Sequence, residues 1–144
     1  MAEKTARVTL VGPMRFEATS GSGHTIAMDT NVEGGGEDTA ASPMELVLMA
    51  LAGCTGMDVI SILRKKRQDV TGYEINVRGV RAETHPMVYT HITVEHVVTG
   101  HRVDPAAVAR AVELSETKYC SVSGMLRKAA QIESTYRVVE AGEQ

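Results

Sequence analysis

Hydrophobic and polar residues alternate over much of the first thirty positions of the chain. Alternating runs at 7–11, 14–19 and 24–29 predict three short strands, and the Ser/Gly-rich residues 20–23 predict the turn that joins the last two. Residues 32–41 are rich in Gly and acidic side chains, so we expect a mobile surface loop there. The beginning of the chain is therefore predicted to fold into strands, turns and a loop.

The pattern changes at Ser42 to a long apolar run that predicts a helix. Ser42 is expected to be the N-cap residue, Pro43 takes the first helical position, and Glu45 completes a capping box. The helix is predicted to continue to about residue 67, and within its apolar part the only charged residues are Glu45 and Asp58. Such a helix lies either at the centre of a fold or in a membrane. Asp58 and the strand-rich remainder of the chain favour the centre of a fold.

Alternation returns after this helix and then gives way to two further helical segments. Strands are predicted at 73–84, 88–99 and 132–139, and helices are predicted to start at Asp104–Pro105 and near Ser121, the latter ending near Ala130. The order of elements indicates an α+β fold in which sheets pack on a long buried helix. The 144 residues are expected to form a single domain spanning residues 1–144.

Composition and charge exclude several classes of function. Hydrophobic residues make up 43% of the chain, enough for an ordinary core, whereas aromatic residues make up 3%. The formal net charge of −3 argues against a general nucleic-acid binder. We interpret the basic run Arg64–Arg67 as the C-terminal end of the long helix, where positive side chains interact favourably with the helix dipole. No apolar leader precedes the first strand, so we expect a cytoplasmic protein with no membrane association.

The two cysteines, Cys54 and Cys120, are the residues most suited to chemistry. Cys54 lies within the long apolar helix, and Cys120 precedes a predicted helix start, where backbone N–H groups favour a thiolate. If the fold brings them together, one thiolate can attack an oxidant and the other can resolve the product as a disulfide. In a reducing compartment such a disulfide would be transient. The alternatives are that Cys54 is a small buried hydrophobic residue and that Cys120 is a helix-start residue packed under Tyr119.

Three short motifs together carry a resemblance to a known family. Ser42–Leu46 (SPMEL), Ala50–Cys54 (ALAGC) and Tyr119–Ser123 (YCSVS) resemble the OsmC/Ohr family, which comprises osmotically inducible protein C and the organic hydroperoxide resistance proteins. The similarity covers nearly the whole chain. The sequence around Met14–Glu17 and Ser22–His24 is most similar to the YhfA-like branch of that family.

The resemblance implies an OsmC-like α+β fold, with mixed and antiparallel sheets on a central helix, in an intertwined homodimer. It implies a thiol peroxidase that reduces organic hydroperoxides and hydrogen peroxide without a metal, flavin or other cofactor. By resemblance Cys54 is the peroxidatic thiol, Cys120 is the resolving thiol, and an external dithiol is the reductant. Two other functions stay open: a binding protein that holds a small hydrophobic ligand at the dimer interface, and a structural dimer that serves partner proteins.

In the peroxidases of this family an Arg–Glu pair supports the reactive thiolate, and here Arg15 and Glu45 are the candidates. Aligned on Pro43 and Cys54, the family's Glu position holds Met44, and the carboxylate stands one residue later. Nine residues separate Glu45 from Cys54, about 14 Å along a helix, so Glu45 would serve the cysteine of a partner subunit. The alternatives are a purely capping Glu45 and a solvated Arg15 on a strand.

The remaining polar residues of the apolar helix and the histidines suggest supporting roles. Asp58 follows Cys54 by one helical turn, and we expect it to accept a hydrogen bond from a buried donor or to make a dimer contact, while its charge opposes a nearby thiolate. His91 and His96 have opposite strand parity, and no metal-binding spacing links the five histidines, so no metal site is predicted.

Overall fold

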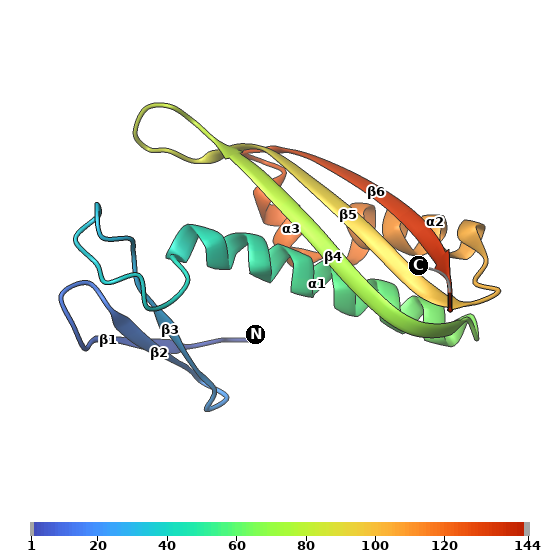
Figure 1. Ribbon diagram of the computed structural model, residues 1–144, viewed down its shortest axis with the longest axis horizontal. Helices are drawn as coiled ribbons and strands as arrows, with labels where there is room; N and C mark the ends of the chain where they lie inside the picture. The colour runs from blue at the N-terminus through green and yellow to red at the C-terminus, as the bar shows by residue number, and fades with distance from the viewer. Residues whose placement is uncertain (1, 143–144) are drawn as a thin grey trace. The chain divides into compact units, whose positions relative to one another are not determined.

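A computed structural model describes residues 2–142 of the chain (Figure 1). The fold is α+β, and its described residues contain two three-stranded sheets and three α-helices. Contacts within the chain divide it into two compact units, Met1–Val47 and Leu48–Gln144, which are described separately. The single domain expected from the sequence stays a prediction.

The first unit contains an antiparallel sheet of the strands β1 (Ala6–Leu10), β2 (Phe16–Ser20) and β3 (Thr25–Met28), in that order. All three were predicted from alternation, with small shifts at their ends. Gly23, at the turn between β2 and β3, has a φ of 92°, a conformation in which a side chain would be strained. Arg15 lies in the turn between β1 and β2, because β2 begins at Phe16, two residues later than predicted.

A buried carboxylate organises the loop that follows β3. Asp29 is 3% exposed, and it accepts hydrogen bonds from the Thr30 backbone N–H at 2.8 Å, the Thr39 N–H at 3.1 Å and the Thr39 hydroxyl at 2.6 Å. The Thr39 hydroxyl and the Thr30 N–H lower the pKa of Asp29 to about 2, although its burial acts in the opposite direction. The segment 32–41 is a mostly exposed loop, as predicted, and Thr39 ties its end to Asp29; its mobility stays a prediction.

Helix α1 (Pro43–Lys65) begins with the predicted capping box. The Ser42 N–H donates to Glu45 Oε1 at 2.9 Å, and the Glu45 N–H donates to Ser42 Oγ at 3.3 Å. The helix ends two residues earlier than predicted, and Arg67 follows in a left-handed conformation with a φ of 57°. The Ala-, Leu- and Met-rich sequence between these ends favours a helix throughout.

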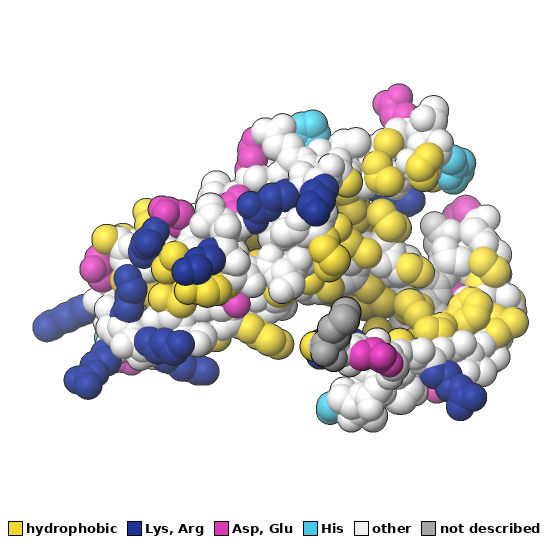
Figure 2. Space-filling view, turned by 180° about the vertical axis from the view of Figure 1, so that it is seen from behind, with side chains coloured by type: hydrophobic (Ala, Val, Ile, Leu, Met, Phe, Trp, Pro, Cys, Tyr) yellow, Lys and Arg dark blue, Asp and Glu magenta, His cyan; other side chains and the backbone are white. Residues whose placement is uncertain are grey.

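The expectation that α1 is buried all round is not confirmed. Five of its residues are buried: Leu51, Thr55, Gly56, Val59 and Leu63. By contrast, Met49 is 54% exposed and Met57 is 74% exposed. Among the described residues α1 is the one helix long and apolar enough to cross a membrane, a property that core helices of soluble proteins share. Hydrophobic side chains also reach the surface elsewhere on the molecule (Figure 2).

The second unit contains a mixed sheet of three longer strands. The strands β4 (Asp69–Arg81) and β5 (Tyr89–His101) pair antiparallel, and β6 (Gln131–Glu140) pairs parallel to β5. A parallel neighbour requires a crossover connection. Three consecutive helical segments supply it: α2 (Pro105–Leu114), the π-helical turn η1 (Ser115–Tyr119) and α3 (Ser121–Leu126). The turn η1 was not predicted, and α3 ends four residues earlier than expected.

One buried cluster joins three elements of this unit. Val59 and Leu63 of α1 and Val98 of β5 pack with apolar side chains of α2 and of the residues before it: Val103, Ala107, Val108, Ala111 and Val112. Asp104 caps α2 by accepting from the Ala106 N–H at 2.9 Å, as its sequence position predicted. This cluster fixes the parts of α1, α2 and η1 that carry the polar residues discussed next.

Candidate functional site

Cys54 lies near the middle of α1, at a partly exposed position beside two glycines. A Cβ at Gly56 would lie 2.7 Å from Ile75 Cδ1 of β4, so the absence of a side chain there lets α1 approach the sheet closely. A Cβ at Gly53 would meet no atom within 4 Å. Gly56 therefore allows a close approach within the described chain, whereas Gly53 faces open space.

Cys120 is the residue at which η1 ends and α3 begins. Its backbone N–H donates to the Ser115 carbonyl at 2.8 Å, which closes the wide π-helical turn, and its sulfur accepts from the Ser123 N–H at 3.3 Å as the N-cap of α3. π-helical turns occur often at functional sites. The side chain is buried, with 4% of the residue exposed.

The structure brings the two thiols together although 66 positions (120 minus 54) separate them. Burial raises the pKa of Cys120 to about 11, the Ser123 N–H opposes this effect, and the hydrogen bond with Cys54 and the charges of Cys54 and Asp58 raise it further. A hydrogen bond raises the pKa of a thiol when it stabilises the protonated form. Cys120 is therefore the donor in this bond, and the Cys54 sulfur is the acceptor.

A chain of hydroxyl groups connects α1 to η1 beside the thiols. The Ser115 hydroxyl donates to Asp58 Oδ2 at 2.8 Å, and Thr55 Oγ1 lies 2.7 Å from Ser115 Oγ. Ser115 has one hydroxyl proton and directs it to Asp58, so Thr55 is the donor in the second bond. The sequence prediction that Asp58 accepts from a buried donor is confirmed, because Ser115 is fully buried. Thr55 and Ser115 were not predicted, since neither belongs to a recognisable motif.

A second buried polar pair lies between β4 and β5. The Tyr73 hydroxyl lies 2.6 Å from Nδ1 of His96, and the two rings stack with centroids 5.9 Å apart. Burial lowers the pKa of His96 to about 4, whereas burial and then the Asp58 charge raise the pKa of Tyr73. His96 Nε2 is buried and has no hydrogen-bond partner among the described residues. The strand parity of His96 correctly separated it from His91, which is exposed.

Arg15 and Glu45 belong to the first unit, and each has partners there. The Arg15 guanidinium donates to the Thr39 hydroxyl at 2.7 Å and to the Thr39 carbonyl at 3.3 Å. The Glu45 carboxylate is the cap of α1, and its hydrogen bonds with Ser42 lower its pKa. The capping function predicted for Glu45 is thus present in the structure. Catalytic functions for Arg15 and Glu45 stay predictions.

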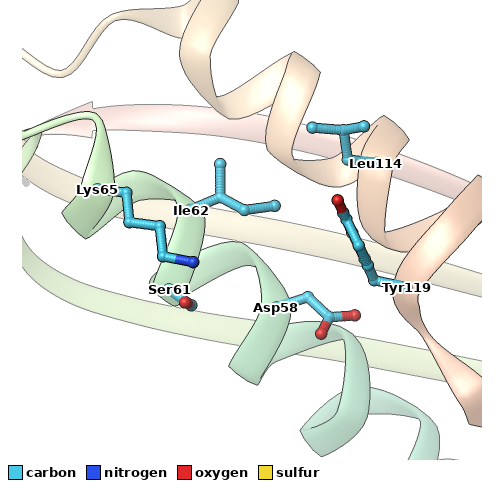
Figure 3. Close-up of a pocket in the computed structure, with 6 residues that line it drawn as sticks. All are labelled: Asp58, Ser61, Ile62, Lys65, Leu114 and Tyr119. Atoms are coloured by element: carbon cyan, nitrogen blue, oxygen red, sulfur yellow. The ribbon is translucent and has the colours of Figure 1, made fainter.

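A surface cavity of about 350 Å³ opens beside the polar chain of the second unit. Figure 3 shows Asp58, Ser61, Ile62 and Lys65 of α1 facing Leu114 of α2 and Tyr119 of η1 across it. The cavity combines apolar walls with one acidic and one basic side chain. Within residues 2–142, no group of three or more His, Cys, Asp or Glu residues is placed to hold a metal ion.

Comparison with known proteins identifies the family of this chain. Residues 35–135 match the family model described as OsmC-like protein. The chain belongs to the OsmC-like family. It is 50% identical to Protein YhfA of Escherichia coli over 136 residues, which cover 94% of this chain and 98% of that protein. The OsmC/Ohr resemblance found in the sequence, including its YhfA-like character, is thereby confirmed.

Solved structures of OsmC-like proteins have the same fold. A hypothetical protein of Aquifex aeolicus is 33% identical, with a TM-score of 0.86 and full coverage of both chains. An organic hydroperoxide resistance protein of Legionella pneumophila is 16% identical, with a TM-score of 0.67 and coverage of 94% of this chain and 97% of that one. The likeness to the Legionella protein demonstrates a common fold across this OsmC-like family.

Proposed function

We propose that this protein is a thiol-dependent redox protein that reduces organic hydroperoxides and hydrogen peroxide through Cys54 and Cys120. The observation that carries the proposal is the hydrogen bond between these two thiols, which lie on different elements of the second unit. Two sulfurs in hydrogen-bond contact can form a disulfide with little movement of the backbone. Some structural neighbours are named organic hydroperoxide resistance proteins, and we take the proposed substrate class from these names.

The proposed reaction assigns a different task to each sulfur. The Cys54 thiolate attacks one oxygen of the hydroperoxide, the O–O bond breaks, and the alkoxide leaves as an alcohol after taking a proton. Cys54 is then a sulfenic acid. The Cys120 sulfur attacks the Cys54 sulfur, the S–O bond breaks, and the oxygen leaves as water. An external dithiol, for which we propose a cytoplasmic source, reduces the resulting disulfide.

The assignment of Cys54 as the attacking thiol follows from exposure and hydrogen bonding. Cys54 is partly exposed and accepts the hydrogen bond, whereas Cys120 is buried and holds its proton. A peroxide or a reductant arriving from solvent therefore meets the Cys54 sulfur first. Arg15 and Glu45 complete the proposed catalytic set, with Arg15 as the cation and Glu45 as its carboxylate partner.

A second candidate function is the binding of a small hydrophobic ligand without turnover. One observation favours it: none of the described groups that shift the pKa of Cys120 is a cation, and the two that act by charge, Cys54 and Asp58, both raise it. The cavity of about 350 Å³ next to Asp58, with Ile62 and Leu114 in its wall, has a size that suits a small ligand. This function would leave both thiols reduced.

Peroxide consumption by variants distinguishes the two functions. With cumene hydroperoxide and dithiothreitol, the wild type should turn over and lose two hydrogens per chain when the oxidised form is weighed without reductant. Cys54→Ser should abolish consumption, and Cys120→Ser treated with the peroxide in the absence of dithiothreitol should accumulate a sulfenic acid that dimedone traps. Equal, slow consumption by wild type and Cys54→Ser would refute the peroxidase and leave ligand binding.

The same assay tests the two residues of the first unit. Glu45→Gln retains an oxygen that can accept from the Ser42 N–H but removes the charge, so it separates capping from catalysis. Arg15→Ala removes both hydrogen bonds that the Arg15 guanidinium donates to Thr39. If both variants turn over like the wild type, the thiol pair acts without them.

A further inference from the structure

Asp58 has well-defined hydrogen-bond partners, and the reaction proposed above assigns no role to its carboxylate. It follows Cys54 by four residues on α1, so both side chains lie on the same face of the helix, one turn apart. One carboxylate oxygen accepts from Ser115 at 2.8 Å, and Thr55 donates in turn to Ser115. This chain of two hydroxyls holds the Asp58 side chain in place.

Three observations place Asp58 next to the chemistry of Cys120. Ser115, which binds its carboxylate, also accepts the Cys120 backbone N–H through its carbonyl at 2.8 Å. The charge of Asp58 acts on Cys120. Finally, Figure 3 shows the Asp58 side chain directed from α1 toward the segment that carries Tyr119, at the wall of the open cavity. A proton taken up by Asp58 can therefore leave to solvent.

We propose that Asp58 is the residue that accepts the proton of Cys120 when Cys120 closes the disulfide with Cys54. The inference deepens the proposed function, because disulfide closure is the step that it serves. The S–H bond of Cys120 breaks, its electron pair forms the S–S bond, and the S–O bond of the Cys54 sulfenic acid breaks. Asp58 holds the proton and passes it to the departing hydroxide, which leaves as water.

The step needs a nearby base because Cys120 is protonated at neutral pH. With a pKa of about 11, about 1 in 10⁴ molecules carries the Cys120 thiolate at pH 7. An anion beside a thiol opposes its ionisation unless the anion itself takes the proton. Asp58 can therefore act in two opposite ways. If its charge only opposes ionisation of Cys120, removing Asp58 would speed disulfide closure. If it accepts the proton, removing Asp58 would slow closure.

Several other titratable groups surround Asp58 and could affect the pH dependence. They come from its own helix, from η1 and its end, and from the sheet: Cys54, Lys65, Tyr119, Cys120, Tyr73 and His96. Glu116 lies near Thr55 around a smaller cavity. Of these, burial lowers the pKa of His96 to about 4 and raises that of Tyr73, so both remain neutral over the pH range in which closure is measured.

Closure can be measured without peroxide. Ellman's reagent should react first at the more exposed Cys54 and release one thionitrobenzoate, and attack by Cys120 on the Cys54 mixed disulfide then releases the second. The rate of the second release, from pH about 6.5 to 9.5, reports proton removal from Cys120 because the leaving group is ionised throughout. The comparison uses wild type, Asp58→Asn, Asp58→Glu and Ser61→Ala. Ser61 lines the same cavity and carries no charge.

Asp58→Asn should slow closure at pH 7 by about 10- to 100-fold, within the range of general-base effects. Its rate should then rise about tenfold per pH unit, as expected for hydroxide-dependent ionisation of a thiol far below its pKa. The wild-type rate should depend on pH much less steeply, Asp58→Glu should recover part of the rate, and Ser61→Ala should match the wild type.

Closure by Asp58→Asn at or above the wild-type rate, with the wild-type pH profile, would overturn the inference. If Asp58→Asn does not fold, the pH profile of the wild type still tests the inference. A wild-type closure rate that rises tenfold per pH unit across the whole range would contradict it. Cys120→Ser should release one thionitrobenzoate and no second one. Because no peroxide is involved, the closure assay tests the role of Asp58 even if the protein shows no peroxidase activity. Likewise, a negative closure result does not affect the peroxidase assay.

Discussion

The two thiols should differ strongly in their reactivity toward an alkylating reagent. Burial is the largest cause that raises the pKa of Cys120 from 9.0 to about 11, a difference of two units. Below pH 9 this difference reduces the thiolate fraction of Cys120 about 100-fold relative to an ordinary thiol, and the thiolate is the reactive form. The 4% exposure of Cys120 adds a steric barrier. Iodoacetamide should therefore label Cys120 at least about 100-fold more slowly in the native protein than in urea.

Peptide mass spectrometry with isotopically distinct iodoacetamide at pH 8 measures both rates in one sample. Cys54→Ala is the matched variant, because it removes the hydrogen bond and the charge that Cys54 contributes but leaves Asp58 unchanged. In this variant Cys120 should react somewhat faster and still far more slowly than in urea. If native Cys120 reacts as fast as in urea, or before Cys54, the assignment of Cys120 as the protected resolving thiol is wrong.

Two further predictions concern stability and assembly. The unfolded chain protonates His96 near pH 6.5, whereas the folded protein does so at about 4, so the free energy of unfolding should fall by about 3 kcal/mol as the pH drops through this window. Urea titrations from pH 7.5 to 4 should show this loss in the wild type and a shallower one in His96→Asn. We also propose that the exposed apolar side of α1 is the homodimer contact, so Met57→Asp should raise the fraction of monomer in sedimentation at micromolar concentration, whereas Thr93→Asp on β5 should not. A wild-type monomer would refute this contact.

Most of the secondary structure could be predicted because local signals and tertiary packing agree. The capping box at Ser42 and Glu45 and the cap at Asp104 are local hydrogen-bonding motifs, and both are present as the sequence predicted. Strand alternation likewise located all six strands. The hydrogen bonds that tie the loop at 32–41 to the buried Asp29 were not predicted, because they join residues up to ten positions apart and follow no local motif.

The candidate site was predictable only in part, for a similar reason. Cys54 and Cys120 stand out as the two cysteines within recognisable motifs, and Asp58 stands out as a charge in an apolar helix. Thr55 and Ser115 carry no such signal, since their importance depends on a contact across 60 residues. The apolar run of α1 does not indicate which of its faces packs within the chain, so the helix was expected to be more buried than it is.

The π-helical turn between α2 and α3 has a consequence for how this region tolerates changes in length. Its five residues place the Ser115 hydroxyl against Asp58 while they deliver the Cys120 sulfur to Cys54. Deleting one residue from 115–119 would disrupt the hydrogen bond from the Cys120 N–H to the Ser115 carbonyl, which spans the whole turn, and would move the sulfur relative to its neighbour. The exposed side chains of Thr117 and Lys118 can thus be exchanged more freely than the number of residues in the turn can be changed.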